Sequence, residues 1–581
     1  MKIEKIKIQH CRGINELVID NELVPNKPII FVAPNGFGKT SLAHAFKSII
    51  NHTSERIEDD DRHNNDNNNK ASIEIQIKED NQIEILSVNE SNYSNTITKK
   101  FDISVITNPS FIKTSSQNIG GRFHTKPKGK LLIDPISITE KINKAYIPVS
   151  KNNLQKAFGI NGDKLFDFDL LFTNKLFVSY SSTCLSEIKK IGNENIFQQL
   201  EAIRQIINTI NFSSAEISSI PELENLNNSN IQYKDLSIFL SKFFNISEIK
   251  TFSLIWFLVY MYRENTEETI KYFDYERYNF YKKKLSSVIK SLNSSKYKQA
   301  YLQEHQGELQ VVIPEPKYIS NGQRDVLVLV SFLYQAQMQL KSKNSILIID
   351  ELFDYLDDAN LTVAQYYISQ LIEDFKASKR YLFPIILTHL NPAFFRNYVF
   401  QKQKVIYLNK EKYKVTPALQ KLINVREDPR IKENVSKYLF HFDPNAFDFS
   451  SDLALFADVR STWGKTGNFK NFLLEEYQKY IDKNDEEFDP LAICALTRVV
   501  IEEKVYNCLS DKKNEFLGEH KTGEKLKIAL STGIEIPEIY FLLRIIYDEG
   551  MHSTSEKNNT AAIEAKLLNP IIKEMIIEAI G

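Results

Sequence analysis

Cysteine is scarce in this sequence. Only four occur among 581 residues, at Cys11, Cys184, Cys494 and Cys508, and no two of them form a CxxC pair. Single cysteines so widely spaced argue against a disulfide framework and against a structural zinc site. The composition therefore favours a reducing compartment.

Long apolar runs are missing as well. The most apolar stretches, such as residues 254–260 and 326–333, are too short to cross a bilayer, and the N-terminal residues hold no apolar signal core. We therefore expect a cytoplasmic protein without a membrane partner.

Neither sign of charge dominates. There are 73 Lys and Arg residues against 74 Asp and Glu, a formal net charge of −1. Binding of nucleic acid would need a local basic patch, and residues 282–284 and 376–380 are two candidates. Solvated helix faces explain such clusters equally well. Tyr278 and Tyr281 beside the first cluster slightly favour nucleic acid, because bases stack on aromatic rings.

The sequence alternates between strand-like and helical periodicity. At about 150 residues per domain, its length predicts two to four domains. We predict an α/β fold in which residues 1–165 and 311–427 form two lobes around a mixed sheet with flanking helices. Residues 166–310 form a helical insertion, and residues 428–581 form an all-α C-terminal domain for partner docking or an effector function.

The strongest local signal is the stretch 33–40, APNGFGKT, between the apolar strand 29–32 and a helical pattern at 41–50. It matches the P-loop pattern except that alanine occupies the first glycine position. Backbone N–H groups of such a loop surround phosphate oxygens, the lysine reaches the β- and γ-phosphates, and the following hydroxyl binds Mg²⁺. A chance glycine turn is the alternative, and the order strand, loop, helix disfavours it. The predicted nucleotide contacts are Asn35, Gly36, Phe37, Gly38, Lys39, Thr40 and Ser41, with Thr40 also a metal ligand.

A second motif, residues 346–351, is an apolar strand that ends in two carboxylates. Beside the P-loop strand, it would deliver both acids to the sheet edge where ligands bind. Asp350 suits the Mg²⁺ shell, and Glu351 suits the general base that orients the attacking water.

A third motif, residues 319–324 (ISNGQR), precedes a long apolar helix and resembles the signature loop of ABC-type ATPases, with Asn321 in place of the usual glycine. The resemblance implies that Ser320, Gly322 and Gln323 contact the nucleotide held by a second subunit. Asp357 stands at the spacing of that family's D-loop. His389, at the end of the apolar stretch 384–388, resembles the switch histidine that contacts the γ-phosphate.

The resemblance covers residues 1 to about 165 and 310 to 425, and Arg12 together with the split head is similar to the SMC/RecF-like branch. It implies ATP and Mg²⁺ as cofactors and Lys39, Glu351 and His389 as catalytic residues. It also implies a head-to-head homodimer, or a higher even oligomer, that closes on ATP and opens on hydrolysis.

The C-terminal part offers two further clusters, namely Arg498 with Glu502 and Glu503, and Arg544 with His552. An arginine and a histidine at a helix end are similar to HEPN-type ribonucleases, although here the two are eight positions apart with a glycine between them. Arg498 and Glu502 are spaced as an ordinary i,i+4 ion pair. A helical docking or dimerisation domain is the favoured interpretation.

The whole architecture resembles the PtuA-type ATPase subunits of Septu antiphage defence systems, including those associated with retrons. That resemblance implies a regulatory ATPase with an HNH-type nuclease partner and, in the retron case, a reverse transcriptase with its noncoding RNA and DNA. Two alternatives stay open: a self-contained toxin with a HEPN-like ribonuclease domain, and a DNA-repair ATPase of the RecF/SMC kind.

Overall fold

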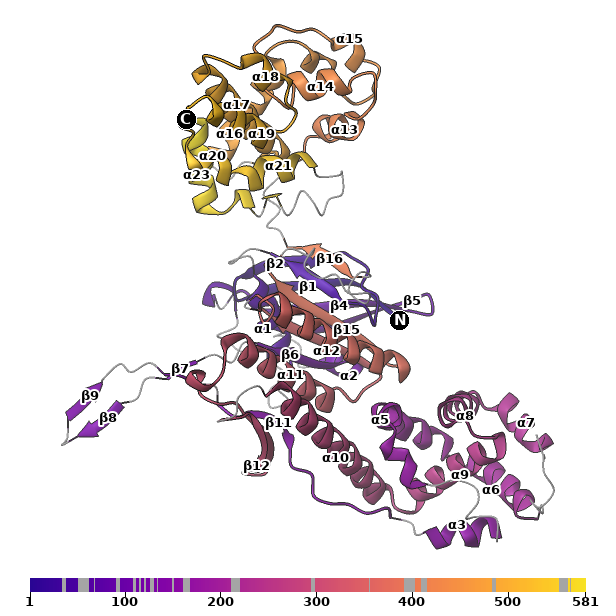
Figure 1. Cartoon of the computed structure of the whole chain (residues 1–581). Helices are drawn as coiled ribbons and strands as arrows, with labels where there is room; N and C mark the ends of the chain where they lie inside the picture. Colours follow the sequence, from indigo (N-terminus) through magenta and orange to yellow (C-terminus); the bar gives the residue numbers. More distant parts are fainter. Residues whose placement is uncertain are drawn as a thin grey trace. The chain divides into compact units, whose positions relative to one another are not determined.

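The computed structural model describes the chain apart from residues 34–37, 51–61, 67, 90–94, 108–110, 114–115, 120–121, 126–129, 133, 149–150, 160–167, 210–219, 294–297, 355, 391–402, 409–414, 483–486, 553–562 and 565. It divides into two compact units (Figure 1). One comprises residues 1–30 and 40–404, and the other comprises residues 31–39 and 405–581.

The central sheet has five strands in the order β16-β3-β15-β14-β6. Their bounds are Lys404–Tyr407 (β16), Ile29–Val32 (β3), Tyr381–Thr388 (β15), Asn344–Asp350 (β14) and Asp102–Ile106 (β6). Strand β14 pairs in parallel with β15 and with β6. The prediction that β14 lies directly beside the P-loop strand β3 is wrong, because β15 lies between the two strands. Every residue of β14 is buried, as expected for a strand covered on both faces.

Helices α11 (Asn321–Gln339) and α12 (Asp358–Ala377) pack against this sheet, α11 on β6 and α12 on β15. Shorter helices of the same region are α1 (Lys39–Ser48), α2 (Thr96–Lys100), and the 3-10 turns η2 (His63–Asn65) and η5 (Pro316–Tyr318). The predicted α/β class, a mixed sheet with flanking helices, is confirmed.

An antiparallel sheet of order β2-β1-β4-β5 and a three-stranded sheet of order β11-β13-β12 accompany the central one. The strands are β1 (Lys2–Cys11), β2 (Ile14–Ile19), β4 (Ser72–Glu79), β5 (Gln82–Asn89), β11 (Ile136–Glu140), β12 (Tyr301–His305) and β13 (Glu308–Val312). Two short pairs complete the set, β7 (Phe111–Lys113) with β10 (Lys130–Leu132) and β8 (Ser116–Ile119) with β9 (Arg122–Thr125).

Strand β12 corrects the prediction that helical structure continues to residue 310. Its sequence YLQEH lacks apolar alternation because β12 is an edge strand that is mostly open to solvent. The hairpin turn to β13 consists of Gln306 and Gly307, which both have positive φ (50° and 79°), as a two-residue turn of this kind requires.

The predicted helical insertion is present and follows helix α3 (Lys151–Phe158). Its helices are η4 (Phe168–Thr173), α5 (Lys175–Ile191), α6 (Glu194–Thr209), α7 (Pro221–Ser229), α8 (Ile231–Phe244), α9 (Glu248–Glu264) and α10 (Thr266–Leu292). Figure 1 shows α5 to α9 gathered into a bundle at one end of the long α10. Helix α9 is buried along almost its whole length, which makes it the core of that bundle.

Hydrogen bonds and an ion pair connect the insertion to the C-terminal ends of α11 and α12. Buried Arg380 donates to the carbonyls of Ser179, on α5, and Ser342, just beyond α11. The Lys175 ammonium lies 2.5 Å from Asp374 of α12. Since α11 begins at the signature motif and α12 at the D-loop, these contacts link the insertion to the elements that carry both motifs.

The C-terminal unit is helical, as predicted. Its helices are α13 (Pro417–Val425), α14 (Lys432–Tyr438), α15 (Ser450–Leu453), η8 (Ser461–Gly464), α16 (Asn468–Ile481), α17 (Pro490–Cys508), α18 (Lys513–Gly518), α19 (Thr522–Ser531), α20 (Glu538–Leu542), α21 (Arg544–His552) and α23 (Pro570–Ile580). Helix α17 is its core, because most of its residues are buried and it contacts α16, α19, α21 and α23. Among the described residues, no helix combines the length and apolar character needed to cross a membrane.

Candidate functional site

The described part of the P-loop is its C-terminal half. Gly38 has φ of 86°, a conformation that favours glycine, and Lys39 begins helix α1. Lys39 is 3% exposed, and its ammonium donates to the carbonyl oxygen of Ala33 at 2.7 Å. Asn35, Gly36 and Phe37 lie outside the described residues.

The turn between β1 and β2 lies against the start of helix α1. The Gly13 N–H donates to the Ser41 hydroxyl at 3.2 Å, and a Cβ on Gly13 would lie only 3.0 Å from that oxygen. The turn that carries Arg12 thus contacts the first turn of helix α1, in which Thr40 is exposed.

The two carboxylates of the second motif stand where β14 ends. Asp350 is its last residue and is 4% exposed. The Glu351 N–H donates to the carbonyl of Leu387, on β15, at 3.1 Å. Glu351 has φ of 55°, in the left-handed region that non-glycine residues rarely occupy and that recurs at functional sites.

This backbone conformation gives a stability prediction. We expect Glu351→Gly to be more stable to unfolding than Glu351→Ala by about 1 kcal/mol, because both lose the carboxylate and only alanine pays for a positive φ. Paired denaturant titrations of the two variants measure the difference. Alanine and glycine variants of equal stability would show that the conformation carries no strain.

The predicted switch histidine follows β15. His389 is 44% exposed, and its Nδ1 lies 2.9 Å from Oδ2 of Asp354, whose side chain is 1% exposed. The Asp354 carboxylate also accepts the backbone N–H of His389 and the hydroxyl of Thr388. Sequence reasoning missed Asp354, because nothing in the order of residues shows which distant side chain it faces.

The signature motif and the D-loop are in direct contact. Ser320 caps helix α11 by accepting the Gln323 N–H at 3.3 Å, and Asp357 caps α12 by accepting the Asn360 N–H at 2.8 Å. A Cβ on Gly322 would overlap the Asn360 amide and lie 3.2 Å from the Asp357 carboxylate. A side chain at position 322 would therefore have to displace the Asn360 amide from its hydrogen bond with Asp357.

Gln323 makes a contact that the resemblance does not imply. Its side-chain amide donates to the carbonyl of Leu292, the last residue of α10, at 2.5 Å. The signature motif is thereby joined to the helical insertion.

The basic cluster at 282–284 does not present a stacking platform. Tyr278 and Tyr281 are buried at 3% and 2% exposure, and Lys282 is paired with Glu304. Burial, followed by repulsion from Lys175, lowers the pKa of Lys284 to about 8. In the second cluster, Arg380 is buried in the insertion contact. The slight preference for nucleic acid that the tyrosines gave is thus not supported.

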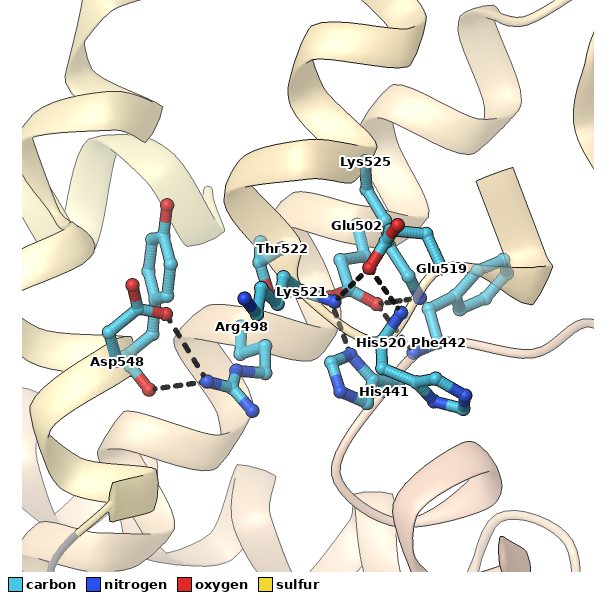
Figure 2. A network of polar contacts seen from close by, with 11 residues as sticks. His441, Phe442, Arg498, Glu502, Glu519, His520, Lys521, Thr522, Lys525 and Asp548 are labelled. Carbon is cyan, nitrogen blue, oxygen red and sulfur yellow. Dashed lines mark hydrogen bonds and ion pairs between the residues drawn. The ribbon is translucent and has the colours of Figure 1, made fainter. Parts of the chain in front are cut away.

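The C-terminal clusters are arranged differently from the expected i,i+4 ion pair (Figure 2). Arg498 donates to the Tyr547 carbonyl at 3.0 Å and lies 3.4 Å from Asp548, which also pairs with exposed Arg544 at 2.6 Å. Glu502 instead bonds other partners, His441 and Lys525 among them. His552 is the last residue of α21, and its side chain lies outside the described part.

Of protein families, curated proteins and solved structures, only solved structures match this chain. No family model and no curated protein matches the sequence. Solved structures with some likeness include an SMC head bound to the C-winged helix domain of ScpA (12% identity, 70% of this chain and 94% of that chain, TM-score 0.26). Others are an Smc head with an extended coiled coil bound to the C-terminal domain of ScpA, derived from Pyrococcus furiosus (16%, 70% and 93%, 0.27), and the recombination mediator RecF with ATP (13%, 66% and 92%, 0.22). At these TM-scores the likeness carries no argument about the site.

Proposed function

We propose that this chain binds ATP with Mg²⁺ and hydrolyses it. The observation that carries the proposal is the meeting of motif residues at the carboxyl ends of the adjacent parallel strands β14 and β15. Asp350 pairs in register with Leu387, the Glu351 N–H bonds Leu387, and Thr388 and His389 follow at once. The carboxyl edge of a parallel sheet is where α/β proteins bind ligands.

Each residue of the proposed site has a role that its chemistry suits. Lys39 supplies a cation for the β- and γ-phosphates, and its bond to the Ala33 carbonyl keeps the ammonium at the loop until a phosphate oxygen replaces it. Glu351 orients the attacking water and receives its proton. His389 contacts the γ-phosphate with the ring nitrogen that Asp354 leaves open.

The Thr40 hydroxyl and the Asp350 carboxylate fit Mg²⁺, because this ion prefers hard oxygen ligands and retains several waters. An exposed hydroxyl and a carboxylate at a strand end suit such a shell. Bound Mg²⁺ would neutralise negative charge on the phosphate oxygens.

The signature motif acts across a dimer in this proposal. Ser320 is exposed and Gly322 is packed on the D-loop, so both motifs form one block that a second copy can meet. Two heads would then enclose two ATP molecules, each bound by the P-loop of one copy and the signature motif of the other. ATP binding becomes the event that closes the dimer.

Mixed subunits test this composite site. Ser320→Arg should block closure, and Lys39→Ala should lose ATP, so each variant alone should be inactive. In a mixed dimer, one site combines an intact P-loop with an intact signature motif, and we expect about half of the parent ATPase activity per mixed dimer. Tagged subunits purified by two affinity steps give such dimers.

The matched control pairs Lys39→Ala with the double variant Lys39→Ala/Ser320→Arg, which leaves no complete site. Verified mixed dimers without recovery would contradict hydrolysis at a shared site. Unchanged ATP binding by Lys39→Ala would remove the P-loop from the proposal.

In the cell, we propose that the ATPase is the regulatory subunit of an antiphage defence complex of the Septu type, with ATP-driven closure controlling an HNH-type nuclease partner. Support comes from the motif set, the compact helical insertion, the helical C-terminal unit and the absence of any metal-binding His/Cys/Asp/Glu group among the described residues. A reverse transcriptase with its nucleic acid would join in a retron-associated complex.

Purification of the chain with the products of its neighbouring genes, followed by mass measurement, tests this role. Copurification of an HNH protein supports it. Toxicity of the chain alone that His552→Ala abolishes would favour the HEPN-like ribonuclease, and ATP-dependent clamping of duplex DNA would favour the RecF/SMC alternative.

A further inference from the structure

Asp354 is a buried carboxylate between the ends of β14 and β15. It follows Glu351 by three residues and precedes Asp357 by three, and its side chain is 1% exposed. A carboxylate so thoroughly removed from water is costly unless hydrogen bonds replace its hydration. Its bonding partners therefore indicate what it does.

Those partners come from Thr388, the last residue of β15, and from His389, which follows it. Oδ1 accepts the hydroxyl of Thr388 and, at 3.2 Å, the N–H of His389, while Oδ2 faces Nδ1 of the His389 ring at 2.9 Å. Thr388 is itself held, since its hydroxyl oxygen accepts the Leu390 N–H at 3.0 Å. One carboxylate thus fixes both the backbone and the ring of the histidine.

The bond to Nδ1 determines the chemistry of the ring. A carboxylate there requires Nδ1 to carry the proton, so Nε2 is the nitrogen left for a ligand. When Nε2 is protonated as well and its N–H donates a hydrogen bond to a phosphate oxygen, the ring is a cation between two anions. The carboxylate of a Ser-His-Asp triad orients and stabilises its histidine in the same way.

We propose that Asp354 is the positioning residue of the switch histidine: it fixes the proton on Nδ1 of His389 and aims Nε2 at the γ-phosphate. This inference rests on the proposed ATPase function. Because Asp354 lies on the short segment between Glu351 and the D-loop residue Asp357, any shift of that segment moves the histidine with it. Contact of the D-loop with a second subunit would thereby change the position of His389 relative to the γ-phosphate.

A double-mutant cycle on ATP hydrolysis tests the role. We expect Asp354→Asn to lower kcat by about 10²-fold with KM changed less than about threefold, because the amide keeps the volume and loses the charge that holds the ring. His389→Gln should have a similar effect, and the double variant should lose no more than either single one. Asp358→Asn, the same change at an exposed position one residue after the D-loop aspartate, is the matched control and should keep the parent rate.

Parent kcat in Asp354→Asn, or losses that multiply in the double variant, would overturn the proposal. A purely structural role would instead reduce thermal stability and ATP affinity together. Melting curves and ATP titrations of each variant therefore accompany the kinetics.

Histidine NMR provides a readout that needs no hydrolysis. In protein labelled with ¹⁵N-histidine, with His389→Gln to assign the signal, we expect the neutral ring of His389 to carry its proton on Nδ1 and to lose that preference in Asp354→Asn. A proton on Nε2 in the parent would overturn the inference. A parent with this signature but no ATPase activity would contradict the proposed function while leaving the Asp354–His389 pairing established.

Discussion

Glu351→Gln is expected to bind ATP as the parent does and to hydrolyse it at least about 100-fold more slowly. The amide keeps the size and the hydrogen-bonding reach of the side chain, and it cannot accept the proton of the attacking water. Because hydrolysis opens the dimer in the proposed cycle, the variant should accumulate as an ATP-locked pair. Single-turnover hydrolysis and an ATP-dependent doubling of mass in solution measure the two effects.

Glu373→Gln is the matched control, since Glu373 is an exposed glutamate on α12 that pairs with exposed Lys376 at 3.8 Å. It should hydrolyse ATP at the parent rate and show no locked pair. Parent-like turnover by Glu351→Gln would remove this residue from the mechanism, whatever the state of the dimer.

The sequence was most informative where apolar runs and motif order coincide. The strands that end at Asp350 and at Thr388 were predicted from their apolar residues. From the sequence, the first of them was expected beside the P-loop strand, whereas the structure pairs it with the second.

Side-chain partners could not be predicted, because they depend on distances between residues far apart in the chain. Asp354 and His389 are 35 positions apart, and only the register of β14 with β15 brings them together. For the tyrosines near Lys282, the sequence pattern instead predicted an exposed surface that the structure does not have. A cationic, aromatic stretch is typical of a nucleic-acid surface, yet one face of α10 buries both rings against the insertion and the head.

In the C-terminal unit, the partners of Glu502 could not be predicted from the sequence either. The spacing predicted an ion pair of Glu502 with Arg498 and made no prediction for its neighbour Glu503. In the structure, Glu503 is half-buried and pairs with Lys470 at 2.6 Å, whereas Glu502 is completely buried. A shift of one position on a helix turns a side chain by about 100°, so one glutamate faces the core and the other its margin.

Glu502 joins three segments of that unit (Figure 2). Its carboxylate accepts the Phe442 N–H at 3.0 Å and the Thr522 hydroxyl at 2.6 Å, and it faces His441 Nδ1 and the Lys525 ammonium, both at 2.8 Å. Burial alone would raise the pKa of Glu502, but His441 and Lys525 outweigh it and hold the pKa well below the usual range. Stability from this carboxylate is therefore present above the unfolded pKa of about 4.3 and is lost as the pH falls below it.

Glu502→Ala is accordingly expected to destabilise the C-terminal unit by about 3–5 kcal/mol, because it leaves the Lys525 ammonium buried at 1% exposure without its carboxylate. In the full chain, hydrogen exchange of α17 peptides should then accelerate by about 10²- to 5 × 10³-fold. Glu503→Ala is the control and should change stability by no more than about 1 kcal/mol, since its ion pair is partly open to solvent. Equal effects of the two substitutions would show that the buried network does not hold the unit together. Lost exchange protection in Glu502→Ala with ATP hydrolysis intact would separate the stability of this unit from the chemistry of the nucleotide site.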